Sequence, residues 1–483
     1  MGVILLAIKD KMVKNKKKVH LIGICGSGMS ALAVLFKESD WSVTGSDANY
    51  FEPIPTYLKK NKIIFYRGYD AKNIPKNLDR VIIGNNIPLA LEENPEKKFA
   101  VESGVKIQSL PEALADLSKN TENTIVVGSS GKSTCTALIA WCLKQAKRDP
   151  SYFIGALPID LKNSGHLGKG ADFVLEGDEY TSSKTNRRSK FLHFNPASVL
   201  LISATHDHIN VFPTEKSYIE PYKKLVAKLS QKGLLVYSLN GKNNKEIAGY
   251  AKSRTVSYGL NNNADYYAQK VKYALQSSFD LTKNGKKIAT IKTNLLGQHN
   301  IENIIGAGAL LLENKKITPK AFTKAIGSFH GIQNRLELKT QKSAVPVYQG
   351  FGSSYEKAKS IFDTLRLHFP DRRIVAVFEP HAFSWRNRKF LKWYENIFDG
   401  VDEVVMLPAT GHGERAKDQL TTIEVWREAK KYKNIHTAHN EKEALEILKK
   451  LIQKNYVIAL VSSGFMFGLV DSVPKLAEKI YQK

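Results

Sequence analysis

A short glycine-rich segment has the residue types that bind a nucleotide phosphate. It follows the apolar run 124–127 and precedes a helix-compatible run, 135–146. Glycines leave room for backbone N–H groups to surround phosphate oxygens, and the helix N-terminus adds partial positive charge. Lysine can reach the β and γ phosphates, and the following serine is placed to hold Mg²⁺. The segment consists of Gly128, Ser129, Ser130, Gly131, Lys132, Ser133 and Thr134.

The spacing of this segment is shorter than the standard phosphate-loop pattern, because Val126 stands where that pattern has its first glycine. A Gly-Ser turn before a helix with a surface lysine is therefore the alternative interpretation. The strand on one side and the helix on the other favour the phosphate loop.

Three further polar clusters lie in the same part of the chain. Glu176-Gly177-Asp178-Glu179 follows a strand predicted at 171–175, and carboxylates near a phosphate loop suit Mg²⁺, with a solvated acidic turn as the alternative. Thr205-His206-Asp207-His208 follows a strand predicted at 199–203 and can ligate a metal or orient a carboxylate. His299 and Asn303 lie at the start of a predicted helix, where asparagine can contact a nucleotide or cap the helix.

The beginning of the chain predicts a Rossmann-like βαβ unit. A strand at 19–24, a helix at 31–36 and a strand at 41–44 surround a glycine-rich turn. Cys25 stands where the dinucleotide fingerprint has a glycine, so the turn is a general phosphate or nucleotide turn, or a tight turn without a ligand. Asp47 and Asn86 follow later strands of this unit, at the edge where such sheets bind ligands.

The last third of the chain predicts another α/β sheet. Strands are expected at 373–378, 403–407 and 456–461, and helices at 356–368, 391–398 and 441–452. Their alternation favours parallel strands. His381 and Arg386 follow the first strand, and Ser462-Ser463-Gly464-Phe465 follows the last. These positions are at the carboxyl ends of strands, where open sheets place ligand contacts.

Length and composition limit the possible classes of protein. The 483 residues predict three domains, at 1–118, 119–335 and 336–483, and the 42% hydrophobic and 24% charged content is that of a globular protein. The net charge of +26 fits an anionic ligand. Because the lysines are scattered and no nucleic-acid motif is present, a nucleic-acid-binding ATPase is supported by charge alone.

Cysteine usage and hydropathy indicate the cellular compartment. The three cysteines, Cys25, Cys135 and Cys142, have no metal-ligand spacing and no disulfide framework, which is typical of a reducing cytoplasm. The apolar run 2–8 is too short to span a membrane, and no other stretch is long and apolar enough. We therefore expect a cytoplasmic protein without a membrane partner.

Taken in order, these motifs resemble the Mur ligases, the ATP-dependent amide-forming enzymes of peptidoglycan synthesis. The short G-x-x-G-K-S-T loop is the form found in this family. The resemblance implies a UDP-sugar-binding Rossmann-like N-terminal domain, a central P-loop ATPase domain with a mostly parallel sheet, and a Rossmann-like C-terminal domain for an amino acid or peptide. It also implies an amide bond between the carboxylate of UDP-N-acetylmuramate and the amine of a murein tripeptide, formed through an acyl phosphate. L-alanine is the alternative acceptor.

The resemblance also implies roles for individual residues, with ATP and Mg²⁺ as cofactors. The expected catalytic residues are Lys132, His208 and Arg335. The expected nucleotide contacts are residues 128–134, His299 and Asn303, and the expected metal contacts are Ser133, Glu176 and His208. The expected UDP-sugar contacts are Gly26, Ser27, Gly28, Asp47 and Asn86, and the expected acceptor contacts are His381 and Arg386. A monomer or weak homodimer is expected.

The sequence departs from the family pattern in three places. The usual acidic and His-His-Pro positions are replaced within Gln349 to Tyr355, a glutamate is replaced by Thr205, and a paired arginine is reduced to Asn334-Arg335. These changes remove charges from expected nucleotide and metal contacts. The alternative they raise is a catalytically impaired UDP-muramyl-binding protein.

Overall fold

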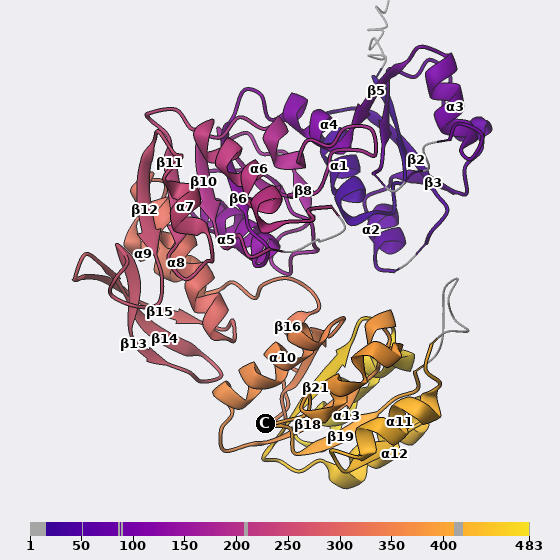
Figure 1. Ribbon diagram of the computed structural model, residues 1–483, viewed down its shortest axis with the longest axis vertical. Coiled ribbons are helices and arrows are strands. Elements are labelled where there is room, and N and C mark those ends of the chain that lie inside the picture. The colour runs from indigo at the N-terminus through magenta and orange to yellow at the C-terminus, as the bar shows by residue number, and fades with distance from the viewer. Residues whose placement is uncertain are drawn as a thin grey trace, which may run out of the picture.

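Three sheets, each flanked by helices, make up three domains (Figure 1). The computed structural model describes residues 16–50, 52–85, 87, 90–206, 211–409 and 419–482. The N-terminal and central domains lie side by side, and the C-terminal domain lies beyond them as a separate lobe. This is the predicted α/β architecture. Within the described residues, no helix has both the length and the apolar character needed to cross a membrane.

The N-terminal domain has a five-stranded parallel sheet in the order β3-β2-β1-β4-β5. The order reverses between β1 and β4, and ligands bind at such a point in doubly wound sheets. The strands are β1 (Lys18–Ile22), β2 (Ser42–Asp47), β3 (Ile64–Arg67), β4 (Arg80–Ile83) and β5 (Lys106–Ser109). The helices are α1 (Ser27–Glu38), α2 (Ile54–Lys60), η1 (Ala71–Asn73), α3 (Pro95–Glu102) and α4 (Leu110–Leu117).

The central domain has a ten-stranded sheet in the order β15-β14-β13-β12-β11-β10-β6-β9-β7-β8. It is parallel from β13 to β7 and antiparallel at both ends. The strands are β6 (Glu122–Val127), β7 (Ser151–Phe153), β8 (Gly165–His166), β9 (Asp172–Gly177), β10 (Ser198–Leu201), β11 (Leu234–Ser238), β12 (Arg254–Tyr258), β13 (Tyr266–Lys272), β14 (Ser277–Lys283) and β15 (Lys286–Thr293). The helices are α5 (Lys132–Gln145), η2 (Lys190–His193), α6 (Glu215–Ala227), α7 (Asn244–Ala248), α8 (Gln298–Glu313) and α9 (Pro319–Gly327).

The apolar core joins the first two domains. On one face of the central sheet α5 packs against α8 and α9. On the other face, side chains of α6 and η2 form a cluster that continues into α1 of the N-terminal domain. A Cβ atom at Gly165 in β8 would come 2.3 Å from the backbone oxygen of Ala31 in α1, so the two domains are in close backbone contact. Their relative position is therefore fixed by packing.

The C-terminal domain has a six-stranded sheet in the order β16-β17-β21-β18-β19-β20. The edge pair β16–β17 is antiparallel, and the other strand pairs of this sheet are parallel. The sequence predicted the parallel strands but not the antiparallel edge. The strands are β16 (Arg335–Leu338), β17 (Val347–Phe351), β18 (Arg373–Phe378), β19 (Glu403–Met406), β20 (Ile435–Thr437) and β21 (Tyr456–Ser462). The helices are α10 (Tyr355–His368), η3 (Phe383–Arg386), η4 (Arg388–Glu395), α11 (Thr422–Lys430), α12 (Glu441–Leu451), η6 (Met466–Gly468) and α13 (Leu469–Ile480).

The helix predicted at 391–398 is wrong. The segment forms the 3₁₀ helix η4, which begins at Arg388 and ends at Glu395. Trp393 and Tyr394 each make ring contacts with Trp385 of η3, and the Tyr394 hydroxyl donates to the Trp385 carbonyl. These tertiary contacts hold a tight, short helical segment, whereas the apolar pattern alone indicated an α-helix.

Candidate active site

The predicted phosphate loop connects β6 to α5, and its two glycines are required by their surroundings. Gly131 caps α5 with φ +78°, in the left-handed region. A Cβ atom at Gly128 would lie 2.9 Å from the backbone nitrogen of Ser203. A Cβ atom at Gly131 would lie 3.0 Å from Oδ1 of Asn303. The loop is therefore packed between the end of β10 and α8, with the predicted nucleotide contact Asn303 beside it.

Lys132 is held inside this loop by two oxygen atoms. Its Nζ donates to the carbonyl of Gly128 at 2.6 Å and to Oε2 of Glu179 at 2.8 Å. The Glu179 side chain is 1% exposed and that of Lys132 is 16% exposed. A buried carboxylate thus fixes the ammonium at the mouth of the phosphate loop, where it can meet phosphate oxygens.

Ser133 and Glu176 form an oxygen-rich pair next to Lys132. The Ser133 hydroxyl donates to Oε1 of Glu176 at 2.9 Å, and the N–H of Gly155 donates to Oε2 at 2.6 Å. Burial raises the pKa of Glu176, and the N–H of Gly155 and the charges of Lys132 and Arg335 oppose the increase. No group of three or more His, Cys, Asp or Glu side chains among the described residues could bind a metal on its own. A hard cation here would need phosphate oxygens in addition to this pair.

The glycine-rich turn of the N-terminal domain lies close to this pair. A Cβ atom at Gly28, in the first turn of α1, would come 3.5 Å from Cζ of Phe153. Phe153 is the last residue of β7, two residues before Gly155, the residue that binds Glu176. Asp47 supports the turn by accepting the N–H of Cys25 at 2.9 Å. The predicted UDP-sugar turn, with Gly26 and Ser27 at the start of α1, therefore packs against the end of β7, and β9 with Glu176 lies between β7 and the strand β6 that leads into the phosphate loop.

The C-terminal domain contacts the central domain at the start of α8, the helix that carries His299 and Asn303. His368, at the end of α10, accepts the N–H of Gly297 through Nε2 at 2.8 Å and donates through Nδ1 to the carbonyl of Ala274 at 2.8 Å. Burial lowers the pKa of His299, and the nearby charges of Arg335 and His368 lower it further. Arg335 on β16 thus acts electrostatically on both Glu176 and His299.

The predicted acceptor residues lie on the C-terminal domain itself. His381 follows β18, and its Nδ1 is 3.7 Å from Oε1 of Glu379. Glu379 is 5% exposed and accepts the Ser462 hydroxyl and the N–H of Met466, which ties the ends of β18 and β21 together. Arg386 is fully buried, and its guanidinium donates to Oε1 of Gln419. His381 is therefore the more accessible of the two predicted contacts.

Of the residues chosen from the sequence, the structure brings the phosphate loop together with Glu176 and Asn303, and it adds others. Asn86 and His208 lie outside the described residues, so their predicted roles stay predictions. Glu179 was visible in the sequence as part of an acidic cluster, although nothing there indicated its partner Lys132. Gly155, Phe153 and His368 have no local signal in the sequence, because each reaches the site from a distant element.

Comparison with known proteins identifies the family. The model of the Mur ligase family catalytic domain matches residues 18–122, and that of the Mur ligase middle domain matches residues 126–311. A UDP-N-acetylmuramate–L-alanine ligase of Dictyoglomus turgidum is 30% identical over 469 residues, covering 95% of this chain and 97% of that protein. A UDP-N-acetylmuramate–L-alanyl-γ-D-glutamyl-meso-2,6-diaminoheptandioate ligase of Haemophilus influenzae is 30% identical over 369 residues, covering 76% and 80%.

Solved structures show the same fold. The UDP-N-acetylmuramate–alanine ligase of Thermotoga maritima matches with a TM-score of 0.76 and 23% identity over 96% of this chain and 99% of that one. A murein peptide ligase of Psychrobacter arcticus matches with a TM-score of 0.64 and 21% identity over 97% and 100%. The chain belongs to the Mur ligase family and has its three-domain α/β fold, as the motifs predicted. It is an ATP-dependent ligase that forms amide bonds.

Proposed function

We propose that the chain joins the carboxylate of UDP-N-acetylmuramate to an amine while converting ATP to ADP and phosphate. The observation that supports this proposal is the contact between Gly28 of the N-terminal glycine-rich turn and Phe153, which is two residues before Gly155, the residue whose N–H binds Glu176. A ligand held at the turn can thus extend toward a nucleotide held at the loop. The relatives from Dictyoglomus turgidum and Haemophilus influenzae are both named for UDP-N-acetylmuramate as substrate.

The proposed reaction has two steps. A carboxylate oxygen of the sugar attacks the γ-phosphorus of ATP, the bond from that phosphorus to the β,γ-bridging oxygen breaks, and ADP leaves as an acyl phosphate forms. The amine then attacks the acyl carbon, loses a proton, and inorganic phosphate leaves as the amide bond forms. The first step brings a carboxylate against a triphosphate, so it requires positive charge and fixed alignment.

The residues of the chain supply these requirements. Lys132 directs its ammonium at the phosphates, Asn303 and His299 contact the nucleotide, and Arg335 adds charge from the C-terminal domain. Ser133 and Glu176 would hold Mg²⁺, because their adjacent oxygens are the ligands this ion prefers. When bound, Mg²⁺ neutralises phosphate charge. Residues 128–131 and Thr134 surround the phosphates, and Gly26, Ser27 and Asp47 contact the sugar nucleotide.

For the acceptor we propose the murein tripeptide, bound through His381 and not through Arg386, because the Arg386 side chain is fully buried. The support is a resemblance in sequence: Phe378-Glu379-Pro380 and Ser462-Ser463-Gly464-Phe465 are similar to segments of murein peptide ligases. The hydrogen bond from Ser462 to Glu379 joins these two segments. L-alanine is the second candidate, favoured by the full-length match to alanine ligases and by the higher TM-score of 0.76.

The test is release of ADP from ATP and Mg²⁺ with UDP-N-acetylmuramate and, in turn, the tripeptide, L-alanine or no acceptor. Release with the tripeptide alone supports the peptide ligase, and release with L-alanine alone replaces it with the second candidate. No release from folded protein that binds UDP-N-acetylmuramate would contradict ligation. It would instead support a binding protein whose activity was lost through the departures at Thr205 and Gln349 to Tyr355.

A further inference from the structure

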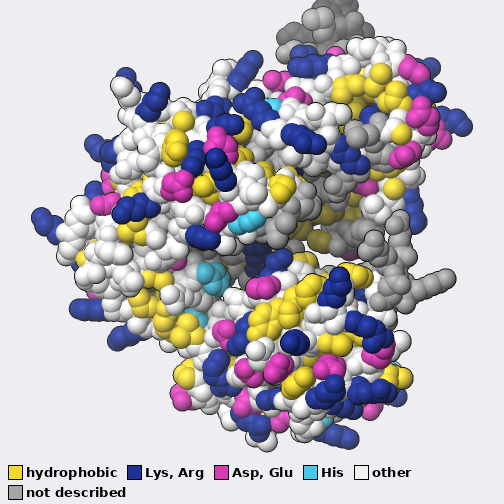
Figure 2. Space-filling model, in the orientation of Figure 1, with side chains coloured by type: hydrophobic (Ala, Val, Ile, Leu, Met, Phe, Trp, Pro, Cys, Tyr) yellow, Lys and Arg dark blue, Asp and Glu magenta, His cyan; other side chains and the backbone are white. Residues whose placement is uncertain are grey.

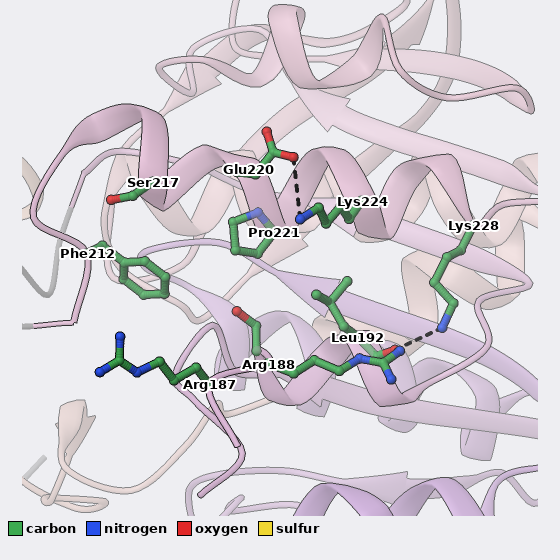
Figure 3. A pocket seen from close by; sticks show the side chains of 10 residues that line it. Arg187, Arg188, Leu192, Phe212, Ser217, Glu220, Pro221, Lys224 and Lys228 are labelled. Atoms are coloured by element: carbon green, nitrogen blue, oxygen red, sulfur yellow. Dashed lines mark hydrogen bonds and ion pairs between the residues drawn. The ribbon is translucent and has the colours of Figure 1, made fainter. Parts of the chain in front are cut away.

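A cavity of about 620 Å³ lies on the central domain between α6 and the segment that leads into η2 (Figure 3). None of its lining residues belongs to the phosphate loop or to the other predicted contacts. Buried Leu192 and Phe212 and half-buried Pro221 form an apolar wall. The remaining lining residues are Arg187, Arg188, Ser189, Ser217, Glu220, Lys224 and Lys228.

Among the described residues that line the cavity, four side chains are cationic and one is a carboxylate. That carboxylate, Glu220, already lies 3.6 Å from the ammonium of Lys224. Among the residues that the structure describes, no acidic side chain forms an ion pair with Arg187, Arg188 or Lys228, the other three cations of the cavity.

Two of these cations are held together on a backbone oxygen. Lys228 Nζ donates to the carbonyl of Leu192 at 2.9 Å, and Arg188 Nη2 donates to the same carbonyl. Figure 3 shows both side chains directed at this point from opposite sides. Burial and the neighbouring Arg188 lower the pKa of Lys228, as expected for two like charges close together. An anion with two charges would relieve this repulsion.

We propose that this cavity is a second ligand site, which binds an organic phosphate by its phosphate group at Arg188 and Lys228 and by its apolar part at Phe212. A guanidinium recognises phosphate oxygens through paired N–H groups, and an ammonium adds a point charge. The volume is in the range of small-molecule sites, which combine apolar walls with a few polar groups. The proposed ligase reaction assigns no role to any of the lining residues, so binding at this site can be tested without that reaction.

The test uses phenyl phosphate as probe, with binding measured by calorimetry and by the increase in melting temperature. The measurements are made on protein that carries Lys132→Gln, so that binding of phenyl phosphate at the phosphate loop contributes little to the signal. We expect saturable binding that weakens at least ~10-fold in Arg188→Gln/Lys228→Gln, because two charge-assisted contacts are lost. Both replaced residues lie at the surface, and only the ends of their side chains are held against the Leu192 carbonyl, so the variant should fold.

The matched control is Lys216→Gln, because Lys216 is an exposed lysine of α6 that does not line the cavity. It should change the affinity less than about twofold. Inorganic phosphate should bind more weakly than phenyl phosphate, since it lacks an apolar part. The proposal is overturned if phenyl phosphate does not bind, if the double variant binds it as well as the parent, or if inorganic phosphate binds equally well.

Discussion

Two buried carboxylates, Glu176 in the central domain and Glu379 in the C-terminal domain, have similar partners and different surroundings. Each lies near the carboxyl end of a parallel strand and accepts one serine hydroxyl and one backbone N–H. Glu176 is acted on by the charges of Lys132 and Arg335. Glu379 has His381 as its neighbour and joins the ends of two strands.

This difference shows that the same local motif can serve two purposes. Around Glu176, cations and a phosphate loop converge, so its carboxylate is available to a cation bound with a nucleotide. Around Glu379, the hydrogen bonds hold the loops that follow the carboxyl ends of β18 and β21. Figure 2 shows hydrophobic side chains gathered on the C-terminal lobe. Phe351, the last residue of β17, is 44% exposed, and Phe465, which follows β21, is 78% exposed. We therefore expect Glu176 to act in phosphoryl transfer and Glu379 to act on acceptor binding.

The largest effect is expected at Lys132. Lys132→Gln keeps a hydrogen-bond donor for Glu179 but removes the positive charge, so ADP release should fall by about 10³-fold or more. The measurement is the rate of ADP release by folded protein. Lys144→Gln, at an exposed lysine near the end of the same helix, is the control and should retain the rate. A fully active Lys132→Gln variant would remove the basis for a phosphate loop.

Glu176→Gln is expected to lower ADP release by about 10²-fold, because the amide cannot supply a negative oxygen to a cation. In the wild type the rate should fall on the acid side at a higher pH than for an ordinary glutamate, since burial raises the pKa of this carboxyl. The pH profile of the rate is the measurement.

The same variant should also change the dependence of stability on pH. Because the pKa of Glu176 is raised in the folded state, its contribution to the free energy of unfolding is fully present below the ordinary glutamate pKa. That contribution is lost as the pH rises through the raised pKa. Glutamine does not ionise, so Glu176→Gln avoids this loss of stability. At neutral pH, the free energy of unfolding measured with denaturant should be at least as large for the variant as for the wild type. If the Glu176→Gln variant is less stable than the wild type and fully active, the role in phosphoryl transfer assigned to Glu176 is contradicted.

Glu379→Gln should raise the KM of the acceptor by about tenfold while leaving the KM of ATP unchanged. The amide oxygen can still accept from Ser462 and Met466, so the loops stay in place and only the charge beside His381 is lost. One charged contact of about 1.4 kcal/mol corresponds to that factor. If ADP release instead falls as far as in Glu176→Gln, the two carboxylates share one role. The distinction between phosphoryl transfer at Glu176 and acceptor binding at Glu379 would then be wrong.

The smallest effect is expected at His368, which joins the C-terminal domain to Gly297 and Ala274. Burial lowers its pKa, so this contact is present above the ordinary histidine pKa and is lost as pH falls through the lowered value. His368→Ala should weaken the contact by about 1–2 kcal/mol. Hydrogen exchange in the segment containing Gly297 should become faster by about tenfold.

The control for this experiment is His436→Ala, which removes a partly exposed histidine of the same domain that faces Glu403. It should leave exchange at Gly297 unchanged. Equal exchange in His368→Ala and wild type would mean that other contacts position the C-terminal domain.

The sequence by itself determined the elements whose causes are local. The phosphate loop could be predicted because its glycines, its lysine and its flanking strand and helix all lie within about twenty residues. The strand predicted at 373–378 has the observed bounds Arg373–Phe378, since a buried parallel strand needs only a continuous apolar run. The acidic cluster was found as well, although Glu176 belongs to β9 and not to the turn that follows the predicted strand.

Only the tertiary structure decided which of these groups meet. Lys132 and Glu179 are 47 residues apart, Gly297 and His368 are 71 apart, and Gly28 meets Phe153 from another domain. The η4 segment became a 3₁₀ helix because of aromatic partners in η3. A single sequence records the residue types and their spacing along the chain. The pairing of a buried charge, the pKa it acquires and the cavity formed by α6 and η2 depend on elements that become neighbours only when the chain folds.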